Sequence, residues 1–213
     1  MANVDSPSGL RPVRYKNGSP WNGAANPYFI PSTYGTALFV GDPVVKTGTS
    51  NTAAVKVPGA GSFAIGTMPE INKATAGDAN RVTGVIIGFA ALPNDLTKAH
   101  NPASTERVAL VCDDPNVVFE IQADGAIPAA SIGLNAVFIY THSGSTTTGL
   151  SGVELDTTSD APAADASNQM IILRAVNRED NDTTITHAKV EVMLVNHTEA
   201  HGNTANGDGI LGV

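Results

Sequence analysis

The sequence predicts an all-β protein, folded as a single β-barrel or jelly-roll-like sandwich. From residue 36 onward, short β-branched or apolar runs alternate with turn residues, a pattern typical of antiparallel sheets. One segment favours helix, residues 93–100 (PNDLTKAH), where Pro93 and Asn94 are suited to begin a turn or two. The chain has 213 residues, a length that large all-β barrels and sandwiches commonly use as one domain.

Residues 1–36 are expected to form an extended amino-terminal arm. Prolines recur through this segment, where they block regular helix and disfavour central strands; they are Pro7, Pro12, Pro20, Pro27 and Pro31. The arm also carries aromatic residues, in which disordered segments are usually poor, so we expect it to pack on a surface. That surface is either the arm's own domain or a neighbouring subunit.

Six residues of the arm are candidates for contact with a partner. Three are basic and give the arm a positive tip suited to an acidic patch, and three are aromatic anchors of the kind that dominates interface energetics. The set is Arg11, Arg14, Tyr15, Lys16, Trp21 and Tyr28. The prolines favour this role because a restricted chain loses less entropy when it is fixed.

Residues 37–197 are expected to form the β-barrel or sandwich domain. Ten segments have the composition of strands: residues 36–40, 42–48, 53–57, 81–89, 107–112, 117–123, 135–141, 152–156, 169–177 and 188–196. Two stretches rich in small residues, 143–152 and 157–168, are expected to be long loops. Residues 198–213 are expected to form a flexible carboxy-terminal tail.

One stretch, residues 111–125 (VCDDPNVVFEIQADG), holds reactive side chains close together. Asp114, Pro115 and Asn116 nevertheless fit the first three positions of a type I turn, so the segment is predicted to be a hairpin. Cys112 is the single cysteine, and its neighbouring carboxylates favour the neutral thiol. We therefore expect Cys112 to be buried and structural.

Carboxylates in two segments are candidate cation ligands. Asp113 and Asp114, with Glu120 expected across the hairpin, offer oxygen ligands for calcium or magnesium. Turn chemistry explains both aspartates without an ion. The acidic run at residues 177–184 lacks the glycine and the distal glutamate of an EF-hand loop, and a solvated hairpin turn is expected there. No metal ligand is therefore expected.

The histidines are candidate catalytic or metal-binding residues. His197 and His201 have the spacing of two ligands on one helical face, but Glu199 stands two residues after His197, whereas the zinc-protease motif places it immediately after. Both are expected to lie in solvent in the tail. The other histidines fall mostly in predicted loops: His100, His142 and His187.

Motifs that carry catalysis are missing from the sequence. It contains no nucleophile elbow, no phosphate-binding glycine loop and no paired C-x-x-C. We therefore expect neither a catalytic residue nor a cofactor, and the protein is predicted not to be an enzyme.

Charge and hydropathy exclude two classes of partner. The formal charge is −8, from 12 Lys and Arg against 20 Asp and Glu, which opposes direct binding to nucleic acid. The longest apolar stretch, residues 84–92, is far too short to span a bilayer, and the amino terminus has no apolar signal region. Charged residues make up only 15% of the chain, which suits a surface that meets other proteins, and self-association as a dimer or trimer is expected.

Four segments together resemble the head decoration, or cement, proteins of tailed bacteriophages. They are residues 8–44, residues 84–89 (GVIIGF), residues 111–122 (VCDDPNVVFEIQ) and residues 133–138 (GLNAVF). The resemblance implies a virion structural protein, synthesised in the host cytoplasm and located on the outer capsid surface. It implies the major capsid protein as partner, with the decoration protein stabilising contacts between capsid subunits.

Two other function classes stay open at this point. A carbohydrate-binding β-sandwich adhesion module ranks second, because such modules use exposed aromatic platforms and only 5% of the residues are aromatic. An enzyme, such as a jelly-roll hydrolase or a metal-dependent cupin, ranks third. Cupins need histidines and glutamates clustered on adjacent strands.

Overall fold

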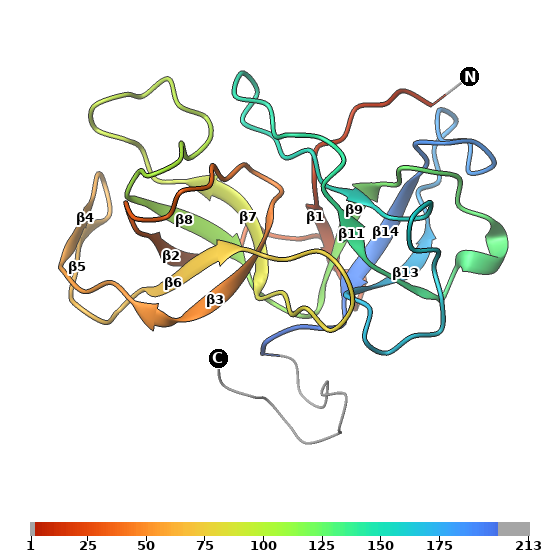
Figure 1. Ribbon diagram of the computed structural model, residues 1–213, viewed down its shortest axis with the longest axis horizontal. Coiled ribbons are helices and arrows are strands. Elements are labelled where there is room, and N and C mark those ends of the chain that lie inside the picture. The colour runs from red at the N-terminus through yellow and green to blue at the C-terminus, as the bar shows by residue number, and fades with distance from the viewer. Residues whose placement is uncertain (1–2, 200–213) are drawn as a thin grey trace.

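Strands make up nearly all the regular structure of the computed structural model, which describes residues 3–199 (Figure 1). The one helical element in this range is a short 3₁₀ turn, η1 (Ala129–Ser131). The all-β prediction is confirmed. Residues 93–100, expected as a short helix, form turns instead. No helix within residues 3–199 is long and apolar enough to cross a membrane.

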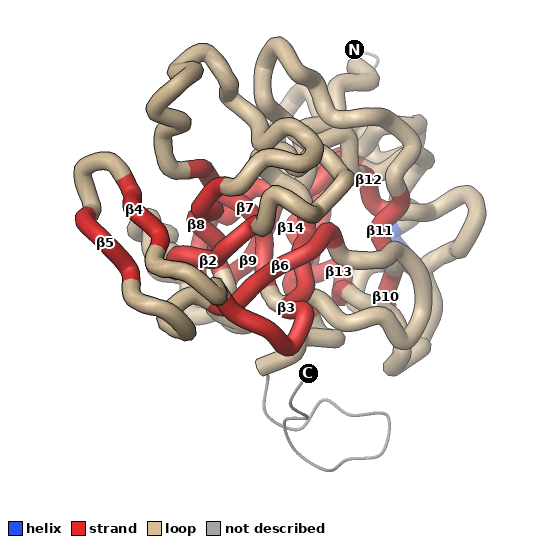
Figure 2. Tube along the Cα trace, turned by 60° about the vertical axis from the view of Figure 1, so that its left-hand side comes forward, coloured by secondary structure: helices blue, strands red, loops and turns tan. Residues whose placement is uncertain are grey.

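Five strands close into a barrel in the order β2-β6-β3-β7-β8. Their bounds are Asn26–Ile30 for β2, Pro69–Lys73 for β6, Pro43–Ser50 for β3, Gly84–Phe89 for β7 and Arg107–Cys112 for β8. Side chains fill this small barrel, as expected for few strands, with Tyr28, Ile30, Val44, Ile71 and Ile86 buried inside one cluster. A hairpin of β4 (Val55–Val57) and β5 (Gly61–Phe63) projects beside the barrel (Figure 2).

A five-stranded sheet in the order β1-β9-β14-β13-β10 packs against the barrel. Its strands are β1 (Arg11–Tyr15), β9 (Val117–Gln122), β14 (Lys189–Leu194), β13 (Met170–Ala175) and β10 (Asn135–Ala136). A two-stranded pair, β11 (Phe138–Ile139) with β12 (Glu154–Leu155), lies beside this sheet. The largest hydrophobic cluster joins both parts, since Val85 of the barrel and Phe119 of the sheet belong to it. Barrel and sheet therefore share one core.

Both outer strands of the sheet are covered by segments of the same chain. Beside β1, the amide of Tyr15 donates to the carbonyl of Ser19 at 2.8 Å, and the amide of Trp21 donates to that of Val13 at 3.3 Å. Beside β10, Asn135 and Ala163 exchange two hydrogen bonds, each of 2.9 Å. The sheet thus offers few unpaired backbone groups along its sides.

Residues 3–36 are not a separate arm but pack on the protein's own domain, which is one of the two alternatives that the sequence left open. β1 pairs with β9, and β2 closes the barrel between β6 and β8. The prolines fit because they stand at tolerant positions. Pro12 adjoins a register shift in β1. Pro27 stands two residues before Phe29, the residue through which β2 pairs with β6, so it lies outside that pairing. The proposed boundary at residue 36 therefore does not separate two structural units.

The segment around Cys112 forms the predicted turn but not the predicted hairpin. The amide of Val117 donates to the carbonyl of Asp114 at 3.1 Å, which closes the turn. β8 pairs with β2 and β7, whereas β9 pairs with β1 and β14. The turn therefore carries the chain from the barrel to the sheet, and Glu120 does not face Asp114 across a hairpin.

The remaining predicted elements are mostly in place. Residues 143–152 and 157–168 are irregular loops, as expected, whereas residues 36–40 make only isolated bridges through Leu38 and Val40. At the carboxyl end, Thr198 is buried and its amide donates to the carbonyl of Val82 at 3.0 Å. The rest of the predicted tail, residues 200–213, lies outside the described residues.

Candidate functional site: an apolar groove between barrel and sheet

An apolar groove of about 420 Å³ opens where the barrel meets the sheet. Segments far apart in the sequence line it: Ser8, Leu10, Arg11, Pro12, Trp21, Val40, Gly41, Ile86, Ile87 and Leu150. Leu10 is fully buried, Trp21 and Ile87 are half-buried, and Leu150 is 38% exposed. The groove therefore presents apolar side chains to solvent at the junction of the two halves of the fold.

Backbone hydrogen bonds hold the walls of the groove. The amide of Leu10 donates to the carbonyl of Gly41 at 3.0 Å, and the amide of Gly41 donates to that of Ile86 at 2.7 Å. In the loop of Leu150, the amide of Ser151 donates to the carbonyl of Val40 at 2.8 Å. The segment before β1, the barrel and the loop of Leu150 are thus fixed relative to one another.

Two glycines allow the segment before β1 to cross the barrel at this point. Gly9 and Gly41 have φ angles of +69° and +95°, which other residues rarely adopt. A Cβ atom on Gly41 would lie 2.5 Å from the carbonyl oxygen of Ser8. The close crossing that shapes the groove therefore depends on glycine at both positions.

Asp42 fixes the loop that carries Leu150. Its buried carboxylate accepts hydrogen bonds from the Ser151 hydroxyl at 2.6 Å and the Phe39 amide at 2.9 Å, and Lys73 Nζ lies 3.3 Å away. Burial raises the pKa of Asp42 above its ordinary value, although Lys73 and the hydrogen bonds act in the opposite direction. Leu150 thus extends from a backbone held by buried polar contacts.

The structure brings together two of the six predicted interface residues at this groove. Arg11 and Trp21 both line it. Tyr15 and Lys16 line a separate cavity next to the turn at residues 114–116. The groove and this second cavity are connected through residues 15–21 of the chain.

The other two predicted interface residues have partners within the protein. Arg14 forms an ion pair with Glu191, with Nη2 and Oε2 2.6 Å apart. Tyr28 is buried in the barrel, and its hydroxyl donates to Asp113 at 2.8 Å. Tyr28 is therefore not available as a surface anchor, because the segment that carries it became a barrel strand.

The carboxylates considered for calcium have separate roles. Asp113 accepts hydrogen bonds from Asn26 and Tyr28, and Asp114 accepts one from the amide of Asn116 at 2.8 Å, within its own turn. Glu120 pairs with Arg178 at 3.1 Å. These three groups do not converge on one point.

The prediction that His197 lies in solvent is wrong. The side chain is buried, and burial lowers the pKa of its imidazole. The chain after β14 continues along the barrel, where His197 bridges to Val82. His100 is also buried and stacks on Phe39 with ring centroids 5.1 Å apart. His201 lies outside the described residues.

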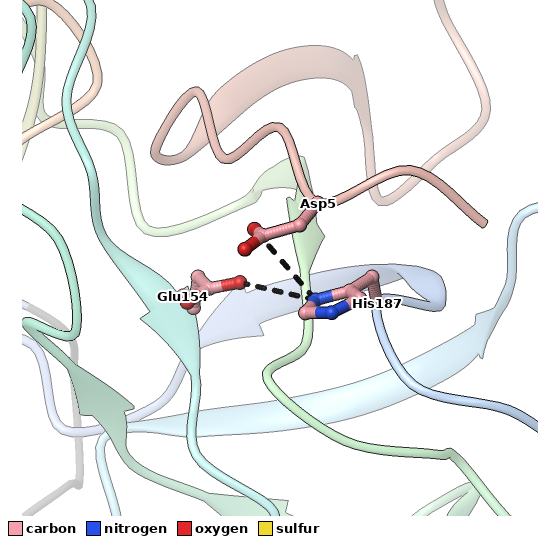
Figure 3. A group of neighbouring side chains, drawn as sticks. All are labelled: Asp5, Glu154 and His187. Atoms are coloured by element: carbon pink, nitrogen blue, oxygen red, sulfur yellow. Dashed lines mark ion pairs between the residues drawn. The ribbon is translucent and has the colours of Figure 1, made fainter.

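A second group of polar side chains gathers at one end of the sheet. Asp5, Glu154 and His187 point toward one another (Figure 3), and His142 contacts both carboxylates. Sequence reasoning missed this group, because its members come from four separate segments with no shared motif. It also missed Leu10, Ile87 and Leu150 as groove residues, although Leu10 and Leu150 are apolar residues isolated among glycine, serine and charged residues.

Comparison of the chain with protein-family models, with curated proteins and with solved structures finds no match.

Proposed function

We propose that the protein is a virion structural protein, a decoration protein of a tailed-phage head. It binds the outer surface of the capsid and stabilises contacts between major capsid protein subunits. The observation that carries this proposal is the apolar groove between barrel and sheet. The resemblance of residues 8–44 to decoration proteins supports it, since this stretch supplies much of the groove lining.

The groove has the properties of a docking site for a projecting apolar side chain. Its lining is largely apolar and its walls are held by hydrogen bonds, so little reorganisation opposes binding. Trp21 belongs to a residue type that is enriched among the strongest contributors to interfaces. Arg11, exposed at the rim, supplies a charge that selects an acidic neighbour on the capsid.

Many copies on a capsid lattice strengthen a modest individual contact. Once one contact forms, neighbouring contacts within the same assembly form at a high effective concentration. Association of the protein with itself, as a dimer or trimer, belongs to the same proposal. It would link adjacent capsid subunits through one bridging unit.

Binding to shells tests the proposal directly. Shells assembled from the major capsid protein of the same genome are mixed with the purified full-length chain and sedimented. We expect the chain to sediment with the shells and Leu150→Asp to lose at least about tenfold in affinity, because a charge enters the apolar groove. Analytical sedimentation of the free protein measures its molecular mass and so reports whether it is a dimer or trimer.

Leu110→Asp is the matched control. Leu110 is 39% exposed, close to the 38% of Leu150, but it lies on β8 and does not line the groove. We expect Leu110→Asp to bind shells like the unaltered chain. Failure of the unaltered chain to sediment with shells would reject the decoration function. Equal binding by both variants would place attachment outside the groove.

A further inference from the structure

Four side chains with metal-binding chemistry meet at one end of the sheet. Asp5 precedes β1, His142 follows β11, Glu154 lies in β12 and His187 precedes β14. One ligand atom each from Asp5, Glu154 and His187 lies within 4.8 Å of the others. His187 Nδ1 is 3.7 Å from Asp5 Oδ1 and 3.9 Å from Glu154 Oε1 (Figure 3).

The charges in this group lack the usual cationic partner. The side chain of Glu154 is only 1% exposed, and Asp5 stands beside it. Within residues 3–199, no lysine or arginine forms an ion pair with either carboxylate; the histidines are the positively chargeable neighbours. A buried carboxylate needs a compensating positive charge or hydrogen bonds that replace water. Two adjacent carboxylates increase that need.

The side-chain amide of Gln122 contacts all three candidate ligand residues. Its Nε2 lies 3.1 Å from Glu154 Oε1 and 3.3 Å from Asp5 Oδ1, and the amide is oriented by Ser6, whose N–H donates to Oε1 at 3.3 Å. A side-chain amide has two hydrogens, and the two carboxylates accept both. His187 Nδ1 lies 3.4 Å from the same nitrogen, and in the tautomer protonated at Nε2 it carries a lone pair that can bind a cation.

The remaining contacts position the carboxylates. Thr141 Oγ1 donates to Glu154 Oε2, and His142 Nδ1 lies 3.3 Å from that oxygen. His142 Nε2 lies 3.6 Å from Asp5 Oδ2. Glu154 Oε2 and Asp5 Oδ2 are thus engaged by these residues, whereas Glu154 Oε1 and Asp5 Oδ1 face His187.

We infer that Asp5, Glu154 and His187 bind a divalent transition-metal cation of the Zn²⁺ class, with His142 and Gln122 as positioning residues. A mixed imidazole and carboxylate donor set suits such ions, whereas Ca²⁺ and Mg²⁺ prefer oxygen ligands alone. Tetrahedral bonds of about 2.1 Å place ligand atoms about 3.4 Å apart. Two of the three separations, 3.7 Å and 3.9 Å, need to contract by a few tenths of an ångström, and the third, between the Asp5 and Glu154 oxygens, lies within 4.8 Å.

The cation fastens the amino-terminal segment to the rest of the fold. Asn3 already binds the loop before β14, since its Nδ2 donates to the carbonyls of Asp182 at 2.7 Å and Thr186 at 2.9 Å. Coordination of the ion by Asp5 and His187 would add a second link between the same two segments, two residues after Asn3. The ion stabilises the folded state, because only the folded chain brings these distant segments together to bind it.

Calorimetric titration of the full-length, chelator-treated chain with ZnCl₂ tests the inference. We expect one Zn²⁺ per chain, a rise in thermal midpoint on Zn²⁺ addition, and no comparable response to CaCl₂. Asp5→Asn and His187→Gln should each weaken Zn²⁺ binding by at least about tenfold. Asp95→Asn, an exposed carboxylate away from the group, is the control and should bind as the unaltered chain does.

Co²⁺ provides a readout of the ligands themselves. The unaltered chain should give visible absorption bands of bound Co²⁺, and Asp5→Asn should lose them while keeping its far-ultraviolet circular dichroism, because Asp5 is exposed. Absence of Zn²⁺ binding by the unaltered chain would overturn the inference. So would unchanged binding in both ligand variants, or binding of Ca²⁺ as tight as that of Zn²⁺.

Discussion

Cys112 illustrates how the surroundings of one residue decide its chemistry. The thiol is buried, and burial, with the adjacent charge of Asp113, raises its pKa to about 12. A thiol with this pKa stays protonated at neutral pH, and the thiolate is the reactive form. The side chain therefore acts as a small apolar group in the shared core.

We predict that Cys112 resists alkylation in the folded protein. Iodoacetamide at pH 8 should modify it slowly in buffer and completely in concentrated urea, as read by mass spectrometry. Cys112→Ala should lower the free energy of unfolding by about 1–2 kcal/mol, through the small cavity it leaves, and should leave shell binding unchanged. Equal alkylation rates with and without urea would show that the thiol is accessible.

Glu191 connects three strands through its carboxylate. Arg14 of β1 binds Oε2, with Nε at 3.0 Å, and Arg174 of β13 binds both oxygens. Burial alone would raise the pKa of Glu191, but the hydrogen bonds from Arg174 and Arg14 outweigh it and hold the pKa below its ordinary value. The folded protein thus holds this carboxylate ionised more strongly than the unfolded chain does.

The sign of the pH dependence follows from that lowered pKa. The stabilisation is complete above the unfolded value and is lost as pH falls through the folded value. We predict that Glu191→Gln lowers the free energy of unfolding at pH 7 by about 1–2 kcal/mol and reduces the loss of stability as pH falls below the ordinary pKa of glutamate. Urea titrations at several pH values measure both effects.

Asp180→Asn is the comparison for that experiment. Asp180 is exposed and its oxygen lies 3.6 Å from Arg178, so removing this surface pair should change stability little. A pH profile of Glu191→Gln identical to that of the unaltered chain would contradict the assigned role of Glu191.

At the scale of elements, β1 and β2 belong to the core structure of the protein. β2 supplies buried Tyr28, Phe29 and Ile30 to the barrel, and Leu10, just before β1, is buried under the sheet. Removing this region would expose the sides of β8 and β9 and open the barrel. The amino-terminal region therefore cannot serve as a detachable attachment arm.

We predict that deletion of residues 2–34 prevents folding. The shortened chain should lack a cooperative unfolding transition and the circular dichroism of the full chain, because two strands and their buried side chains are gone. Deletion of residues 2–7, which removes Asp5 but neither strand, is the control and should fold. A cooperative transition in the longer deletion would mean that the barrel closes without β2.

Local sequence patterns located many strands but could not assign their partners. β8 and β9 have clear apolar patterns, yet which sheet each joins depends on packing between distant segments. β6 was missed because Ile71 is its one fully buried residue, so its apolar signal is weak. β2 was missed because Pro27 lies within it and Pro31 follows it, and the local preference of proline was overridden by tertiary pairing.

At the scale of the whole molecule, both candidate sites arise from the meeting of separate segments. The groove needs the segment before β1, the barrel strand β7 and the loop of Leu150 to converge. The group around Glu154 needs Asp5 and His187 from opposite ends of the chain. Composition could indicate a protein-binding surface, but neither set of residues has a spacing that local rules recognise.

The covered sides of the sheet bear on how the protein behaves when crowded. Exposed strand edges template the pairing of one chain with the next, which leads to amyloid-like aggregates. Here the barrel is closed, and the segments at Trp21 and Ala163 occupy the two flanks of the sheet. Within residues 3–199, neither the barrel nor the five-stranded sheet therefore offers a long free edge for pairing between copies, so contacts through these two parts are left to side chains.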